Sequence, residues 1–411
     1  MSRVHIIGAG LAGLSAALAA VDRGHDVTVY EAGPAAGGRC RSYFDRELGC
    51  RIDNGNHVWL SGNWGISNYL SRIDAQATAV QLEEAAFPFI DLGNGERWSV
   101  RPNAGMVPWW ILSRRRAVPG ARLAEYAGML SLLRAGPDST VADALGHGPL
   151  VTRLMEPLAV AALNTAITAG SARLMAAVVR ETLAKGGKAC APIYPQDGLS
   201  ETFVEPAVTA LRSAGASLRF GCRVAGLEFA DGRVAAIQTP DARIDVADSS
   251  VIVATPPPVT TQLVPGTSAP DEFEAIVNIH YRIDVRDAPA FIGLIGGTAE
   301  WVFTKADVVS VTISAANRLV DRAVSDIAAT VWPEVCRALA LSEPQPPSRV
   351  LKEKRATFAA TPAQDRLRPA ARTRFQNLAL AGDWTATGLP ATIEGAIRSG
   401  RAAVDVLLAA G

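Results

Sequence analysis

The sequence contains few cysteines, and their spacing excludes a disulfide framework and a metal site of the usual kind. There are five, an odd number, and no two of them form a CxxC pair. We expect free thiols in a reducing compartment, with no bound metal. The cysteines stand at positions 40, 50, 190, 222 and 336.

The chain also lacks a net charge and a long hydrophobic run. Its 40 basic and 40 acidic residues cancel, so no overall field would attract nucleic acid. No stretch reaches the 18 or so apolar residues of a membrane span, and no signal peptide precedes the first predicted strand. We therefore predict a cytoplasmic protein. With 411 residues it should form two or three compact units.

The first 31 residues carry the clearest motif. A buried strand is predicted over residues 4–7, followed by a GxGxxG turn, an Ala/Leu-rich helix and a second strand over 26–30 that ends at an acid. This is the order of a dinucleotide-binding unit, in which the glycines admit a pyrophosphate and the acid binds a ribose. The residues expected at the nucleotide are Gly8, Gly10, Leu11, Ala12, Gly13, Glu31 and Ala32.

Two further glycine elements stand at opposite ends of the chain. Gly37, Gly38 and Arg39 follow the second strand, and the arginine would supply a forked donor to a phosphate oxygen. Near the C-terminus, an apolar strand over 378–381 is followed by Gly382-Asp383 and then by a helix that begins near Ile393. Each end therefore has a strand–helix junction with glycine at its turn.

In the middle of the chain, strands are predicted over residues 218–229 and 233–238. The Asp231-Gly232 pair between them indicates a hairpin.

Taken together, these elements resemble the FAD-dependent amine oxidase and phytoene desaturase superfamily over most of the chain. The resemblance implies an α/β fold, with a Rossmann-like FAD-binding domain of discontinuous segments and an inserted mixed α+β substrate domain. The FAD domain would comprise residues 1–70, 191–258 and 351–411, and the substrate domain 71–190 and 259–350. It further implies FAD contacts at Glu31, Arg39, Val224, Gly382, Asp383, Ala391, Thr392 and Ile393.

A narrower resemblance rests on three segments: the Asp53-Asn54-Gly55-Asn56-His57 element, residues 194–199 and residues 354–362. They are similar to the squalene-associated branch of that superfamily, which acts in bacterial hopanoid synthesis. The resemblance implies that reduced FAD delivers hydride to hydroxysqualene while the hydroxyl leaves as water. An unidentified electron donor would reload the flavin. The alternative is a carotenoid or phytoene-type desaturase or isomerase acting on a polyisoprenoid.

The catalytic candidates are His57 and Asp53. Loss of a hydroxyl calls for a general acid, and His57 is the only histidine that lies in a motif. Asp53 could orient His57, or act as the acid itself if desolvation raises its pKa. On the other reading Asp53 and Asn54 shape the turn, while Gly55, Asn56 and His57 only contact the cofactor.

Residues 106–123 permit two interpretations. Trp109 and Trp110 stand beside aliphatic residues and are followed by Arg114, Arg115 and Arg116. This composition suits a membrane surface, with the rings at headgroup depth and the arginines on anionic phosphates. Alternatively, both tryptophans belong to the core of the substrate domain and the arginines form a solvated turn. A lipid-binding protein without chemistry, built on a related fold, is disfavoured by the intact phosphate loop.

Overall fold

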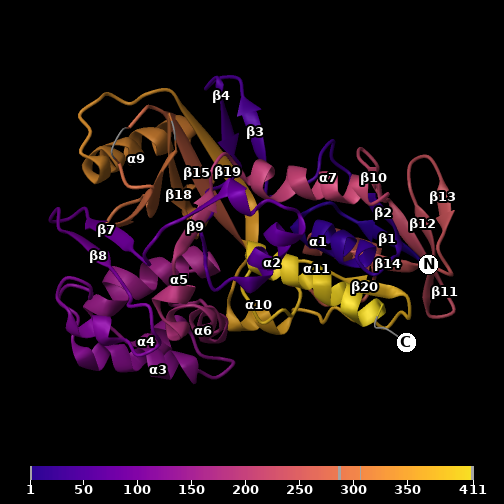
Figure 1. Ribbon diagram of the computed structural model, residues 1–411, viewed down its shortest axis with the longest axis horizontal. Coiled ribbons are helices and arrows are strands. Elements are labelled where there is room, and N and C mark those ends of the chain that lie inside the picture. The colour runs from indigo at the N-terminus through magenta and orange to yellow at the C-terminus, as the bar shows by residue number, and fades with distance from the viewer. Residues whose placement is uncertain (1, 286–287, 306, 409–411) are drawn as a thin grey trace.

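The computed structural model describes residues 2–285, 288–305 and 307–408. Figure 1 shows two halves joined side by side. One half holds a sheet flanked by helices from both ends of the chain. The other half combines a second sheet, covered by helix α9 (Val324–Leu339), with a group of short helices.

The first half is built on a five-stranded parallel sheet. Its strand order is β10-β2-β1-β14-β20, so strands from distant parts of the sequence become neighbours. The central strands are buried on both faces, as expected for a parallel sheet covered by helices. This confirms a Rossmann-like domain of discontinuous segments, although the predicted domain bounds stay a prediction. The strands are β1 (Arg3–Ile7), β2 (Asp26–Tyr30), β10 (Ser217–Arg219), β14 (Ser250–Val253) and β20 (Leu378–Leu380).

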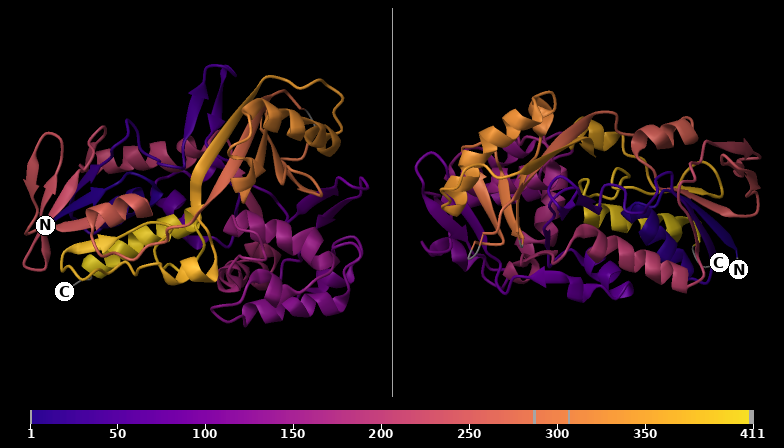
Figure 2. Two further views of the ribbon diagram at one scale, coloured as in Figure 1. Left: turned by 180° about the vertical axis from the view of Figure 1, so that it is seen from behind. Right: turned by 90° about the horizontal axis from the view of Figure 1, so that it is seen from above.

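The two ends of the chain pack against each other through helices α1 (Leu11–Val21) and α11 (Ile393–Leu407). Their proximity is visible in Figures 1 and 2. Ser15 donates its hydroxyl to the carbonyl of Ile397 at 2.7 Å. Gly400 allows the close approach, because a Cβ there would clash with the backbone of Ala12. The nucleotide half therefore closes only when both ends of the chain are in place.

Strand β11 (Gly226–Ala230) and strand β12 (Arg233–Gln238) form the hairpin predicted from Asp231-Gly232. Both turn residues have positive φ, at 49° and 72°, as a two-residue hairpin loop requires. The strand predicted to start at Leu218 does not continue to Phe229. It is interrupted over residues 220–225, where Gly221 takes a φ of 65°.

The second half contains a seven-stranded mixed sheet of order β19-β15-β18-β17-β16-β7-β8. Helix α9 covers one of its faces, against the alternate residues Val277, Ile279 and Tyr281. Between these lie Asn278 and His280, on the opposite face. The strands are β7 (Phe87–Asp91), β8 (Arg97–Val100), β15 (Phe273–Arg282), β16 (Phe291–Ile295), β17 (Trp301–Lys305), β18 (Val308–Ile313) and β19 (Ser348–Phe358).

Short helices and small sheets complete the chain. No helix within the described ranges is both long enough and apolar enough to cross a membrane. The remaining helices are α2 (Trp64–Arg72), α3 (Gly128–Leu133), α4 (Val141–Leu145), α5 (Glu156–Leu163), α6 (Ala172–Glu181), α7 (Glu205–Ser213), α8 (Pro257–Leu263) and α10 (Pro362–Arg366). The remaining strands are β3 (Ser42–Asp45), β4 (Cys50–Asp53), β5 (Trp59–Leu60), β6 (Ala79–Gln81), β9 (Pro192–Pro195) and β13 (Arg243–Asp245).

Candidate active site

The turn between β1 and α1 has the geometry of a phosphate-binding loop. Gly8 takes a φ of 107°, and Gly13 lies so close to Gly8 that a Cβ on Gly13 would clash with the Gly8 carbonyl. At Gly10, by contrast, a Cβ would meet nothing within 4 Å. Residues Leu11 and Ala12 open helix α1, whose N-terminus has no side-chain cap. The turn thus combines open space with free helical N–H groups, which fits a pyrophosphate.

Glu31, which directly follows β2, is hydrogen-bonded to the same turn. One carboxylate oxygen accepts from the N–H of Ala9 at 2.8 Å, and the other from the N–H of Gly33 at 2.7 Å. Ala32 lies exposed beside it. The acid predicted to bind ribose therefore also fixes the turn, while each of its oxygens keeps a further lone pair for a ligand.

Arg39 and Asp383 form an ion pair that joins the N-terminal and C-terminal motifs. One guanidinium nitrogen donates to both carboxylate oxygens, at 2.8 and 2.7 Å, across 344 residues of sequence. Asp383 raises the pKa of Arg39, mainly by charge attraction, and its own side chain is nearly buried. The Arg39 side chain remains 44% exposed, so part of it is free to contact a ligand. Gly37 brings the arginine to this place by donating its N–H to Ala9 at 2.8 Å.

Arg368, which sequence reasoning missed, is hydrogen-bonded to the segment that follows Gly382. The Arg368 side chain is fully buried and ion-pairs with Asp365 at 3.0 Å. It donates to the backbone carbonyl of Asp383 at 3.3 Å and to the Thr387 hydroxyl at 3.0 Å. Nothing in the sequence marks this arginine among the chain's other basic residues, because its partners are brought to it only by folding.

Helix α11 begins at Ile393, as predicted, and Thr392 caps it by accepting from the N–H of Gly395 at 3.0 Å. Ala391 precedes the cap and is partly buried. The cap fixes the start of the helix, whose N-terminus carries a partial positive charge. This end can support a negative charge on a bound cofactor.

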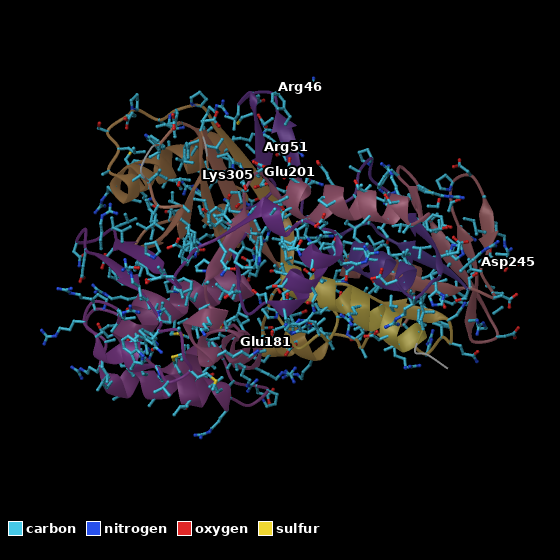
Figure 3. All side chains as sticks on the ribbon, in the orientation of Figure 1. Arg46, Arg51, Glu181, Glu201, Asp245 and Lys305 are labelled. Atoms are coloured by element: carbon cyan, nitrogen blue, oxygen red, sulfur yellow. The ribbon has the colours of Figure 1, made fainter. Side chains whose placement is uncertain are left out.

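Glu394, in the first turn of α11, is a second residue that sequence reasoning missed. Its two oxygens accept from the N–H groups of Gly65 and Ile66, at 2.8 and 2.7 Å, at the start of α2. Arg398 donates to Glu394 and also to Glu181, which is labelled in Figure 3. These contacts lock α2 and α6 to the start of α11.

Val224 lies in the irregular segment between β10 and β11 and is buried. Among the residues that the structure describes, no hydrogen bond is made by its N–H or its C=O. A buried backbone donor and acceptor normally find partners. An adenine edge, which offers one group of each kind, would satisfy them.

The loop that follows β4 carries His57. Asp53 anchors its start, because one oxygen accepts from the Ser42 hydroxyl at 2.6 Å and from the Leu199 N–H at 2.9 Å. The other oxygen lies 3.5 Å from the ammonium of Lys305, labelled in Figure 3. In the described part of the chain no hydrogen bond joins Asp53 to His57. Asp53 therefore fixes the loop and does not hold the imidazole directly.

The His57 side chain is exposed, yet the protein around it perturbs its titration. Desolvation lowers its pKa below the ordinary 6.5, Asp53 opposes this shift and Arg39 adds to it. The loop is also hydrogen-bonded to the arginine segment, because the Asn54 side-chain amide donates to the backbone carbonyl of Arg39 at 3.2 Å.

A second histidine, His280 on β15, lies close to Asp53. It is buried, and its Nδ1 is 2.7 Å from the Ser310 hydroxyl. Burial lowers its pKa to about 4, although the nearby Asp53 acts in the opposite direction. His280 is thus a neutral residue at pH 7.

A parallel sheet with a GxGxxG turn, an acid at the end of its second strand and a C-terminal Gly-Asp held by an arginine is the arrangement of a FAD-binding oxidoreductase. The chain belongs to the flavin containing amine oxidoreductase family, whose model matches residues 11–283 and 301–408. The cofactor of this family is a flavin, and the chain's donor groups fit FAD. It is accordingly a FAD-dependent oxidoreductase.

Comparisons with individual proteins show which members of the family the chain resembles. The chain is 46% identical to a hydroxysqualene dehydroxylase of Rhodopseudomonas palustris, over 99% of both chains. It is 43% identical to the hydroxysqualene dehydroxylase of Zymomonas mobilis, also over 99% of both. The zeta-carotene desaturase of a Synechocystis species is 36% identical, but over only 22% of this chain and 18% of its own.

Among solved structures the fold resembles a cyclohexylamine oxidase from Brevibacterium oxydans, with a TM-score of 0.70, 16% identity and 99% of both chains covered. A putative protoporphyrinogen oxidase from an Exiguobacterium species matches with a TM-score of 0.67, 16% identity and 97% coverage of both. At such low identity these two establish the fold alone, and they confirm the predicted fold class.

Proposed function

We propose that this chain removes the hydroxyl group of hydroxysqualene reductively, giving squalene. The observation that carries the proposal is the 43–46% identity to hydroxysqualene dehydroxylases over nearly the whole chain. The carotene desaturases, which represent the alternative, match only a fifth of it. The site supports the assignment because the loop that carries His57 is joined to Arg39, whose backbone carbonyl accepts from the Asn54 amide at 3.2 Å.

FAD would be held by the groups described above, and when reduced it supplies hydride to the substrate carbon. The glycines at 8, 10 and 13 admit the pyrophosphate, and Glu31 the ribose. The phosphates and the flavin ring would be contacted by Arg39, Asp383 and the start of α11. Gly38, Gly55 and Asn56 would line the same part of the site. An electron donor of unknown identity completes the redox balance.

The leaving hydroxyl needs a proton, and we assign this step to the His57 imidazole. Proton transfer to the substrate oxygen lets the C–O bond break with release of water, while a C–H bond forms at the same carbon. Asp53 is the less suitable acid, because its two oxygens are already engaged by the Ser42 hydroxyl, the Leu199 N–H and the Lys305 ammonium. Asp53 thus positions the loop, and His57 holds the proton.

An anaerobic single-turnover assay tests this function. The flavin of the purified protein is reduced with dithionite, hydroxysqualene is added, and flavin reoxidation is followed together with the hydrocarbon product by mass spectrometry. We expect reoxidation in step with squalene formation, and deuterium from labelled reduced flavin should enter the product. If the reduced flavin stays reduced while the oxidised protein desaturates a polyene, the desaturase alternative is correct.

We also propose that the protein docks on the surface of an anionic membrane through an apolar patch in segment 106–130. Of the nine large hydrophobic side chains that are exposed among the described residues, six lie in this segment. Trp110 is buried and contacts Tyr126, whereas Trp109 is 52% exposed with Arg116 over its ring at 5.3 Å. The core interpretation is therefore confirmed for Trp110 and wrong for Trp109, and membrane contact stays a prediction. The patch comprises Met106, Val107, Trp109, Leu112, Leu123 and Leu130.

The charge around this patch favours anionic lipid. Arg114 and Arg115 are exposed beside Leu112, and Arg122 stands next to Leu123. A basic side chain near an anionic surface contributes about 1 kcal/mol, and insertion of apolar side chains adds the hydrophobic term. A C30 hydrocarbon product is insoluble in water, so a protein that rests on the bilayer can exchange it there without crossing the membrane.

Vesicle co-sedimentation checks the docking. We expect the protein to bind phosphatidylglycerol vesicles more tightly than phosphatidylcholine vesicles, and less tightly at higher salt. The double variant Trp109→Ser, Leu112→Ser should weaken binding at least about tenfold, since each side chain contributes roughly 1.5 kcal/mol or more when buried. Val324→Ser removes an exposed apolar side chain on α9 and should change nothing. Equal binding by all variants, or dimerisation through the patch without vesicle binding, contradicts the proposal.

A further inference from the structure

Two polar residues stand opposite each other on the face of the second sheet that is not covered by α9. Asn278 on β15 and Thr312 on β18 are direct cross-strand partners. Asn278 is 2% exposed, and Thr312 is partly buried. A buried polar pair on a strand costs stability unless its groups are hydrogen-bonded, so their partners show what the pair does.

Their partners lie in the loop that carries His57. The Asn56 side chain donates to the Thr312 hydroxyl at 3.0 Å, and that hydroxyl donates to the side-chain carbonyl of Asn278 at 2.9 Å. The Asn278 amide then donates to the backbone carbonyl of Asn54 at 3.2 Å. The pair therefore binds the loop on both sides of Gly55.

Gly55 itself lies directly on Asn278. A Cβ at this position would be 3.3 Å from the Asn278 amide nitrogen, closer than most side chains tolerate. The glycine thus permits the loop to approach the sheet closely enough for both flanking bonds to form. His57 lies two residues beyond Gly55, directly after the held segment.

We propose that Thr312 and Asn278 are positioning residues for His57, and that the Thr312 hydroxyl is the central link. A hydroxyl can accept from Asn56 and donate to Asn278 at the same time, which no apolar side chain of the same shape can do. The inference rests on the proposed acid role of His57. It adds that the seven-stranded sheet sets the position of this loop. Asp53, at the start of the loop, also contacts that sheet, through its ion pair with Lys305 on β17.

The test compares Thr312→Val with Thr312→Ser. Valine keeps the shape and removes the hydroxyl, whereas serine keeps the hydroxyl. Since misplacement of a catalytic group by about 1 Å can cost about 100-fold, we expect the valine variant to reoxidise reduced flavin about 10- to 100-fold more slowly with hydroxysqualene. Its KM and FAD content should stay within about twofold, and its pH profile should lose the limb that His57 produces.

Serine should restore the rate to within about threefold of the wild-type rate, because it restores both hydrogen bonds. Thr304→Val is the matched control, since the Thr304 hydroxyl donates to the Pro289 carbonyl, just before β16, and not to the loop. If the valine variant fails to fold, Asn56→Ala removes the same link from the loop side and should show the same loss.

The proposal is overturned if Thr312→Val turns over within twofold of wild type, or if serine is no better than valine. These outcomes differ from a failure of the proposed function, in which the wild-type protein itself does not form squalene. In that case the same variants, assayed on whichever polyene the wild type converts, still decide whether Thr312 positions the loop.

Discussion

Replacing Gly13 with alanine should give a protein that does not retain FAD. The added Cβ would clash with the carbonyl of Gly8, and the nearest other contact is the side chain of Ala254. Relief requires α1 to move away from the β1 turn, which costs more than the roughly 1–3 kcal/mol typical of an overpacked core. We expect an almost complete loss of flavin absorbance after purification, and a clearly lower melting temperature for the apoprotein.

Gly10→Ala separates binding from folding in the same turn. Gly10 has ordinary extended backbone, and its added Cβ would meet no protein atom. The apoprotein should therefore melt as wild type does, whereas the methyl group would occupy the space left for the pyrophosphate and FAD should again be lost. Full flavin content in Gly10→Ala would show that the phosphates lie elsewhere.

Replacing His57 with alanine should lower the rate of squalene formation by about 10²- to 10⁴-fold, the usual contribution of a general acid. FAD content should stay near that of wild type, since Arg39, Asp383 and the glycine turn are untouched. His147→Ala, at an exposed position outside the site, should keep full activity. A His57→Ala protein with turnover within about threefold of wild type would show that His57 only contacts the cofactor or shapes the turn. Asn56 and Asp53 would then have no catalytic group to position.

The pH dependence provides a second measure of the same role. Desolvation and the Arg39 charge lower the pKa of His57 below 6.5, against the opposing effect of Asp53. An acid must be protonated to act, so the single-turnover rate should fall as pH rises above this pKa, approaching tenfold per pH unit. The limb should be absent in His57→Ala. A rate that rises with pH over the same range would require a group that acts as a base.

Local motifs were predictable because their physics is contained in adjacent residues. The glycine turn, the acid at Glu31, the hairpin at Asp231-Gly232 and the start of α11 each depend on backbone preferences within a few positions. The prediction of a strand through residues 220–225 was wrong, because a contact with a distant residue decides the backbone there. Its apolar pattern favoured a strand, but Cys222 donates its backbone N–H to Glu31 instead of joining a sheet.

The sequence by itself determined the fold class, the cofactor and the loops that would hold it. The tertiary structure alone decided which side chains meet. Arg39 and Asp383 pair across 344 residues, Arg368 and Glu394 have backbone partners in other segments, and Thr312 reaches the His57 loop from another sheet. A hydrogen bond between distant residues leaves no periodicity or spacing in the chain, since it depends on where two surfaces come together on folding.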